Sequence, residues 1–357
     1  MNFPCGPLGD SHNFNQKVEL IETFEGLKVK KPRPIFWEWL FLDPSSSFRV
    51  LTKQIAGCNF NQYLGNIAYS DPQMVDIPGT CQYLLQPSNL NITEDSVLFK
   101  NFGRLLAFTT TFGIIDLHAE NLIIYNEYVQ ILDIECVLFS AESPADTLLI
   151  PNRASNFEKS LFFKLNLLVV GFSSKIIQQI MEGLYQEFKF LIENRLKLSE
   201  VASIEFEQMN RTPVRFLIRP SKEYTKDFSQ ADILLPMVPE EKEQLDRLDI
   251  PYFFGLPGHA DLFYFQSPNQ KSRVQLKNLD PIKKKIQRSF QTPNILLEHN
   301  RLLKIFKQSM VMVASRFLED GASMEIQSEN FSIKFDGSIL KIHTIEFSLE
   351  SNKVRSK

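Results

Sequence analysis

The sequence predicts an α+β fold, with strand signals near both ends of the chain and helical signals between them. Residues 17–31 alternate around a Glu-Gly pair, as a β-hairpin does. Residues 324–350 alternate again, as two or three strands with Asp336-Gly337 at a turn. Helical periodicity occurs in three ranges, 96–111, 157–198 and 293–318. Strands grouped apart from helices are the pattern of an α+β protein.

The segments between these ranges are interpreted from their prolines, helix-start residues and short apolar runs. Residues 35–65 are aromatic-rich and predicted to be helical, with a break at "PSSS". Residues 66–96 contain three prolines and are predicted to be mostly loop. Two short apolar runs, 122–125 and 128–134, are typical of a second hairpin. Near the middle of the chain, residues 239–248 predict a capped surface helix and residues 249–265 a loop.

Composition limits the class of protein and of partner. The chain has 357 residues, 43% apolar and 23% charged, which suits a globular protein of two domain-sized units or one two-lobed body. A net charge of −3 gives no reason to expect a nucleic-acid partner. The longest apolar runs, such as residues 164–172, are far shorter than the roughly 20 residues that span a bilayer. We expect neither nucleic-acid binding nor a membrane span.

Cysteine usage and the N-terminal residues predict the compartment. The four cysteines are far apart and form no Cys-x-x-Cys pair, so we expect neither a disulfide framework nor structural zinc. The first residues, "MNFPCGPLGDSHNF", lack the basic start and apolar stretch of a signal peptide. These observations predict a cytoplasmic protein.

Acidic and amide side chains lie in tight register around the second predicted hairpin. Asp116 precedes Asn121 by five residues, and Asp133 follows Asn121 by twelve. Phosphoryl transfer from ATP needs a carboxylate near the acceptor hydroxyl, an amide and a second carboxylate for magnesium, and a lysine for phosphate. The spacing fits a kinase catalytic loop, in an order closer to lipid kinases than to protein kinases. Lys31, at the end of the first hairpin, is the candidate lysine.

Each of these residues also has a structural explanation when taken alone. An Asp-x-His loop is usually a hydrogen-bonded turn, and Lys31 at a strand end is usually solvated. Asp133 is harder to explain, because a buried carboxylate needs a partner or a metal. The segment "GDSHN" (9–13) has one glycine, which is weak evidence for a phosphate loop. The four residues in order favour a phosphoryl-transfer site.

Six motifs follow one another between residue 9 and about residue 265. They are "GDSHN" (9–13), "KKPR" (30–33), "DLHAEN" (116–121), "ILDIE" (131–135), "PVRFLIRPSKEY" (213–224) and "DIPYF" (249–253). In this order they resemble the dehydratase domain of class II lanthipeptide synthetases, the LanM family. The resemblance implies a two-lobed, lipid-kinase-like fold with helical elaborations. It also implies a two-step reaction on a precursor peptide, in which ATP phosphorylates Ser or Thr and the phosphate is then eliminated.

The resemblance assigns a role to each matching residue. The phosphorylation half comprises Lys31, Asp116, His118, Asn121 and Asp133. Within it, ATP is bound through Lys31, Asn121 and Asp133, and Mg²⁺ through the last two. The elimination half comprises Asp10, His12, Arg215 and Ser221, the last of which is usually Thr in the family. Arg215 suits a departing phosphate because its guanidinium binds two oxygens at once.

Several roles within the elimination half stay open. Asp10 and His12 are the candidates for the base that takes the α-proton, and both could instead contact phosphate or serve the structure. Ser221 keeps a hydroxyl but loses the methyl that restricts its rotamers, so we expect slower elimination rather than none. Without the resemblance, Arg215 and Arg219 would be interpreted as surface or ion-paired helix residues.

The resemblance also predicts the domains and the partners. It places a small N-lobe at residues 1–90 and a larger C-lobe at residues 91–357. Family members carry a helical region before "GDxHN" and a zinc cyclase after the dehydratase, whereas only eight residues precede Gly9 and no cyclase ligand set follows residue 265. We therefore expect a precursor peptide with its leader as substrate. A separate cyclase, or a protein that supplies the N-terminal region, is a further expected partner.

Two other functions compete with a dehydratase. One is a kinase that stops at phosphorylation, and the other is a binding module with an incomplete fold. Residues 79–85, "GTCQYLL", depart from the Trp and Glu that the family tends to have between the lobes, so no adenine contact is assigned there.

Overall fold

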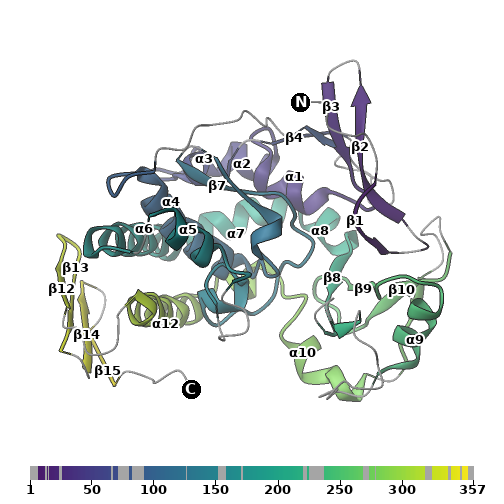
Figure 1. Ribbon diagram of the computed structural model, residues 1–357. Helices are drawn as coiled ribbons and strands as arrows, with labels where there is room; N and C mark the ends of the chain where they lie inside the picture. The colour runs from purple at the N-terminus through teal and green to yellow at the C-terminus, as the bar shows by residue number, and fades with distance from the viewer. Residues whose placement is uncertain are drawn as a thin grey trace.

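A five-stranded antiparallel sheet forms the beginning of the chain in the computed structural model (Figure 1). Its strands, in the order β1-β2-β3-β5-β4, are β1 (Pro7–His12), β2 (Gln16–Thr23), β3 (Gly26–Lys30), β5 (Thr80–Gln82) and β4 (Ala68–Ser70). The predicted hairpin is confirmed, with Glu19 opposite Lys30. The prediction of mostly loop for residues 66–96 missed β4 and β5, because the three prolines lie between or after these strands and interrupt neither.

The structure describes most of the chain and leaves short ranges undescribed. The described residues are 7–12, 14, 16–23, 26–65, 67–70, 80–82, 92–125, 127–151, 158–169, 172–219, 223–224, 237–267, 273–277, 279–317, 324–336, 339–345 and 348–352. For β1 only the backbone is described. The predicted domain boundary at residue 90 lies outside the described residues, and the two-domain division stays a prediction.

Helices fill the centre of the molecule. They are α1 (Phe36–Leu42), α2 (Ser47–Thr52), α3 (Phe60–Tyr63), α4 (Val97–Phe112), α5 (Leu161–Leu168), α6 (Ser174–Glu193), α7 (Arg195–Ile204) and α8 (Phe206–Arg211). Serine side chains begin several of them, as Ser46, Ser96 and Ser173 accept hydrogen bonds from free backbone N–H groups of the first turn. α4 ends at Gly113, whose left-handed φ of 59° turns the chain out of the helix.

The helices α4 and α6 pack closely because each offers a glycine to the other. A Cβ on Gly103 would lie 2.0 Å from the carbonyl oxygen of Ile180, and a Cβ on Gly183 would lie 1.9 Å from that of Lys100. Both neighbouring atoms belong to the backbone and cannot move aside like a flexible side chain. The two glycines therefore set the distance between α4 and α6.

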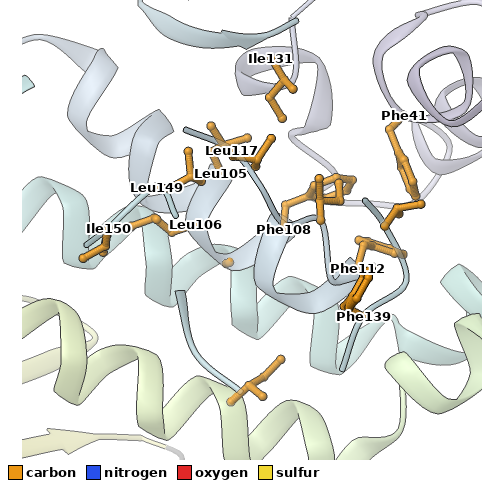
Figure 2. Packing of buried hydrophobic residues seen from close by; sticks show 14 of the residues in the cluster. Phe41, Leu105, Leu106, Phe108, Phe112, Leu117, Ile131, Phe139, Leu149 and Ile150 are labelled. Atoms are coloured by element: carbon orange, nitrogen blue, oxygen red, sulfur yellow. The ribbon is translucent and has the colours of Figure 1, made fainter. Parts of the chain in front are cut away.

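Phenylalanine rings fill the core beside this helix pair. Phe108 and Phe112 on α4 have ring centres 4.7 Å apart, and Phe41 of α1 lies 5.4 Å from Phe112 (Figure 2). Phe48 and Phe60 join the same cluster. The rings meet mostly edge to face or tilted, the geometry that aromatic pairs prefer. The heavy use of Phe in the sequence thus ties the first helices to α4.

The second predicted hairpin is confirmed, and it follows α4 directly. A 3₁₀ turn, η1 (Ala119–Asn121), leads into β6 (Leu122–Tyr125), which pairs antiparallel with β7 (Tyr128–Ile131). Main-chain bonds then join the segments on the two sides of the hairpin: Leu132 N–H donates to Asn121 O at 2.9 Å, and Ile115 N–H donates to Cys136 O at 2.9 Å. The loop before the hairpin and the strand-like segment after it are therefore held side by side.

A four-stranded sheet lies at one end of the molecule, below β1 in Figure 1. Its order is β11 (Arg273–Gln275), β10 (Phe263–Phe265), β9 (Phe253–Gly255) and β8 (Val214–Phe216). The loop predicted over residues 249–265 is wrong, because β9 and β10 are short aromatic strands separated by a Gly- and Pro-rich turn. The alternative of a helix around Arg215 is also wrong, since Arg215 lies on β8.

Two predicted helices differ in detail from the structure. The helix expected over residues 239–248 is α9 (Pro239–Asp246), but Glu241 and Gln244 are buried, so it is not only a surface helix. The helix expected over residues 293–318 is divided into α11 (Pro293–Leu296) and α12 (His299–Phe317). A short 3₁₀ turn, η5 (Asp280–Ile282), and α10 (Lys283–Gln287) precede them, and η2 (Pro144–Thr147) follows the second hairpin.

The C-terminal residues form four strands where two or three were expected. The sheet is a meander of β12 (Met324–Gln327), β13 (Phe331–Phe335), β14 (Ile339–Thr344) and β15 (Ser348–Asn352), beside α6 and α12 (Figure 1). Gly337 of the predicted turn lies outside the described residues, but β13 and β14 pair as expected. The mixed α+β class is confirmed. None of the described helices combines the length and apolar character that a bilayer crossing requires.

We predict that Gly103→Ala destabilises the protein by at least about 3 kcal/mol, because the added methyl meets a helix backbone rather than a side chain. Chemical denaturation measures the loss. Lys197→Ala, on an exposed face of α7, is the control and is expected to change stability by less than about 0.5 kcal/mol. Equal effects of the two substitutions would contradict the close contact.

Candidate functional site

A buried ion pair joins the end of the first sheet to the first helix. Lys31 follows β3, and its Nζ lies 3.0 Å from Oε1 of Glu38 on α1. Their side chains are 4% and 0% exposed. Glu38 is the acid of "FWEWLFL", a helix that is otherwise apolar and wholly buried. A carboxylate there is tolerated only because cations accompany it.

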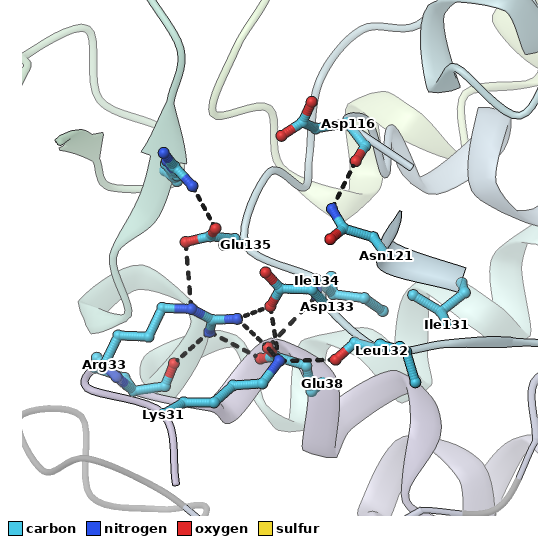
Figure 3. A network of polar contacts seen from close by, with 12 residues as sticks. Lys31, Arg33, Glu38, Asp116, Asn121, Ile131, Leu132, Asp133, Ile134 and Glu135 are labelled. Carbon is cyan, nitrogen blue, oxygen red and sulfur yellow. Dashed lines mark hydrogen bonds and ion pairs between the residues drawn. The ribbon is translucent and has the colours of Figure 1, made fainter. Parts of the chain in front are cut away.

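Asp133 shares these cations with Glu38 (Figure 3). Lys31 Nζ donates to Asp133 Oδ1 and to the carbonyl of Leu132, both at 2.7 Å. Arg33 forms ion pairs with the same Asp133 oxygen and with Glu38. Burial raises the pKa of the Asp133 carboxyl, but Arg33 and Lys31 outweigh burial and hold the pKa well below its usual range. Asp133 is therefore ionised at every ordinary pH.

Glu135 connects this cluster to Arg215. Arg33 Nε lies 3.2 Å from Glu135 Oε2, and Arg215 Nη1 donates to Glu135 Oε1 at 2.5 Å. The backbone supports the contact, because Arg215 N–H donates to Glu135 O at 2.8 Å and so places β8 beside the segment that carries Asp133. Burial lowers the pKa of Arg215, but the attraction to Glu135 and to the other acidic groups nearby together outweighs burial, and the net effect raises the pKa. The guanidinium therefore stays charged. Figure 3 shows the connected network from Lys31 to Glu135, which Arg215 of β8 joins.

The loop before the hairpin places three of the candidate side chains together. Asn121 Nδ2 donates to the backbone carbonyl of Asp116 at 3.0 Å and lies 3.3 Å from His118 Nε2. Asp116 has a φ of 64°, a left-handed conformation that aspartate tolerates better than most residues. Burial raises the pKa of the Asp116 carboxyl, His118 and Arg215 lower it in part, and Glu135 and Asp133 add to the increase. The result is a carboxylate that takes up a proton more readily than a solvated one.

The donor atoms fit a magnesium ion held in the way that kinases hold it. The hydrogen bond from Nδ2 directs the amide oxygen of Asn121 away from Asp116, and Figure 3 shows this oxygen on the side of Asp133. Amide and carboxylate oxygens are hard ligands that suit Mg²⁺. The part of the chain that the structure describes holds no group of three or more His, Cys, Asp or Glu arranged as a metal site.

The structure joins five of the predicted site residues in two groups and connects Arg215 to the first of them through Glu135 and Arg33. Lys31 meets Asp133, and Asp116, His118 and Asn121 share one loop. The side chains of Asp10 and His12 and the whole of Ser221 lie outside the described residues. Only the backbone of β1 is known there, with His12 opposite Gln16.

Three members of the network had no role in the sequence prediction: Arg33, Glu38 and Glu135. Arg33 and Glu135 stand inside the quoted motifs "KKPR" and "ILDIE", so their motifs were found but their roles were not. The signal for Glu38 was available as a single acid in an apolar helix. No protein-family model matches this chain. A search of curated proteins also finds no match.

We predict that Glu38→Gln lowers the free energy of unfolding by about 3 kcal/mol or more, because two buried cations lose the charge between them. Denaturant titration measures the change. The control is Glu19→Gln, whose ion pair with Lys30 spans 3.2 Å between half-exposed side chains and contributes less than about 1 kcal/mol. If both variants lose the same stability, the buried cluster is not what holds β3 to α1.

Proposed function

We propose that this chain is an ATP-dependent peptide dehydratase of the LanM type, with a two-lobed, lipid-kinase-like architecture. It phosphorylates Ser or Thr of a precursor peptide and then eliminates phosphate, in lanthipeptide biosynthesis. The observation that carries the proposal is the buried group of Lys31, Glu38 and Asp133. Active kinases hold the phosphate-binding lysine of the third strand with a glutamate of the following helix, and keep a metal-binding aspartate beside it. Residues about 100 positions apart meet here in that arrangement.

The phosphorylation step uses the loop and the cation cluster. Lys31 binds the nucleotide phosphates, and Asn121 and Asp133 hold the metal. Bound Mg²⁺ neutralises charge on the transferred phosphoryl group. Asp116 accepts the proton of the substrate hydroxyl as the oxygen–phosphorus bond forms. Burial raises its pKa above that of a solvated aspartate, which makes the carboxylate a stronger base. His118, 3.3 Å from Asn121, orients the amide.

The elimination step uses Arg215. A base removes the α-proton of the phosphorylated residue, the carbon–oxygen bond at the β-carbon breaks, and phosphate leaves with the electron pair. Arg215 is charged and 6% exposed, and it donates to the departing oxygens in this scheme. Asp10 and His12 stay the candidates for the base, and Ser221 the candidate for a further donor. The ion pairs of Glu135 with Arg33 and Arg215 support the idea that both steps use one connected site.

The test is incubation of the purified chain with ATP, Mg²⁺ and the precursor peptide encoded beside it, followed by mass spectrometry. We expect loss of one water for each modified Ser or Thr. A stable phosphate adduct without water loss would assign a kinase instead. Calorimetry with Mg-ATP separates both enzymes from a binding module, which would show no nucleotide binding in a folded sample.

We predict that Asp133→Asn lowers ATP-dependent turnover by at least about 1,000-fold, because the metal loses its charged ligand. Arg215→Ala is expected to leave phosphorylation in place while the phosphorylated peptide accumulates. Mass spectrometry of the peptide distinguishes the two variants. Dehydration by Arg215→Ala at the normal rate would remove Arg215 from the elimination step.

We predict that phosphorylation slows as pH falls through the raised pKa of Asp116, because the base must be ionised to accept a proton. The acidic limb of kcat therefore lies above 3.8, the ordinary pKa of aspartate. Mg-ATP affinity is expected not to share this limb, because the pKa of Asp133 is held below that range. A pH–rate profile and calorimetry at each pH check the separation. An acidic limb in both would assign the titration to the nucleotide site.

A further inference from the structure

The turn between β1 and β2 is attached to a loop that lies far away in the sequence. Phe14 has a left-handed φ of 68°, and its backbone N–H donates to Asp249 Oδ2 at 2.6 Å. The two residues are 235 positions apart. Asp249 follows α9 and opens the "DIPYF" motif, which leads into β9. Figure 1 shows β1 on the side of the first sheet nearest β9 and β10.

Arg247 makes a second contact between the same two places. Its Nε donates to Asp249 Oδ2 at 3.0 Å, and its guanidinium carbon lies 4.1 Å from the ring centre of Phe14. Asp249 is 1% exposed, so a buried carboxylate holds both the main chain of the turn and the cation that covers its ring. Charge-assisted hydrogen bonds and stacked guanidinium groups are stronger when desolvated. We call Phe14, Arg247 and Asp249 the turn latch.

The loop side of the latch is fixed to the neighbourhood of Arg215. Gln244 of α9 accepts a hydrogen bond from Asp249 N–H through its carbonyl, at 3.1 Å, and one from Tyr252 N–H through its side chain, at 2.8 Å. The Tyr252 ring stacks on the Arg215 guanidinium, 5.3 Å from ring centre to guanidinium carbon. Residues 249–252 thus contact the β1–β2 turn through Asp249 and Arg215 through Tyr252.

We propose that Asp249 and Arg247 are positioning residues, which hold the β1–β2 turn against the sheet that carries Arg215. The inference rests on the proposed function and concerns its elimination step. β1 carries Asp10 and His12, so the latch sets where this strand lies relative to the phosphate that Arg215 would hold. In the proposed scheme phosphorylation depends on Lys31 and Asp133, which pair with Glu38 and Arg33 and with each other.

The experiment compares Asp249→Ala with Asp249→Asn, which keeps an acceptor oxygen, and with Asp261→Ala as the matched control. Asp261 lies between β9 and β10 and accepts an exposed hydrogen bond from Gln275 at 2.7 Å. Amide hydrogen exchange over residues 7–23 reports the latch itself. We expect exchange to be about tenfold faster in Asp249→Ala, intermediate in Asp249→Asn and unchanged in Asp261→Ala. Unchanged exchange in Asp249→Ala overturns the latch.

The ratio of phosphorylated to dehydrated peptide reports the positioning role. In Asp249→Ala we expect phosphorylation within about twofold of the parent protein and at least about tenfold more phosphorylated peptide, with recovery in Asp249→Asn. Faster exchange with an unchanged ratio overturns the positioning role. A parent protein that modifies no peptide overturns the proposed function and the positioning role with it, whereas the exchange result still decides whether the latch exists.

Phe14→Ala keeps the test valid if Asp249→Ala fails to fold. It removes only a partly exposed ring and leaves the backbone N–H bond to Asp249 in place. We expect about threefold faster exchange over residues 7–23, because one cation–ring contact is lost. The same variant is expected to shift the peptide ratio in the same direction. No change in either measurement removes the contact between Arg247 and the Phe14 ring from the latch.

Discussion

The buried carboxylate of Glu38 is the constraint on which the site depends. A charge with no exposure must be accompanied by cations, and the chain supplies them from the segment directly before the helix. The same two cations reach Asp133 after the second hairpin. One desolvated acid therefore holds the end of the first sheet, the first helix and the segment of Asp133 together.

Packing in the core fixes the positions of the segments that carry the site. The glycine contacts of α4 and α6 and the phenylalanine cluster fix α4, and Gly113 ends it just before the loop of Asp116 and Asn121. Main-chain bonds on both sides of the hairpin then place Asp116 and Asp133 on adjacent segments. β8 joins this backbone through Glu135, so a residue from a distant part of the chain enters the site by pairing of main chains as well as of charges.

The elements predicted correctly are those specified by neighbours in the sequence, such as the two hairpins and α4. The spacing of Asp116, Asn121 and Asp133 could be interpreted because one hairpin relates them. The contact of Glu135 with Arg215 could not, since the two residues are 80 positions apart and local periodicity does not record such a pairing. β9 and β10 were missed because three-residue strands separated by glycine and proline have no measurable period.

The positive and negative charges of the network are equal in number. Lys31, Arg33 and Arg215 provide three positive charges, and Glu38, Asp133 and Glu135 provide three negative ones. Every cation in this set is already neutralised by a partner. A bare polyanion would have to take a cation from a buried carboxylate, which is unfavourable. For the proposed nucleotide site, this balance favours a nucleotide that arrives with its own counterion and leaves the protein ion pairs largely intact.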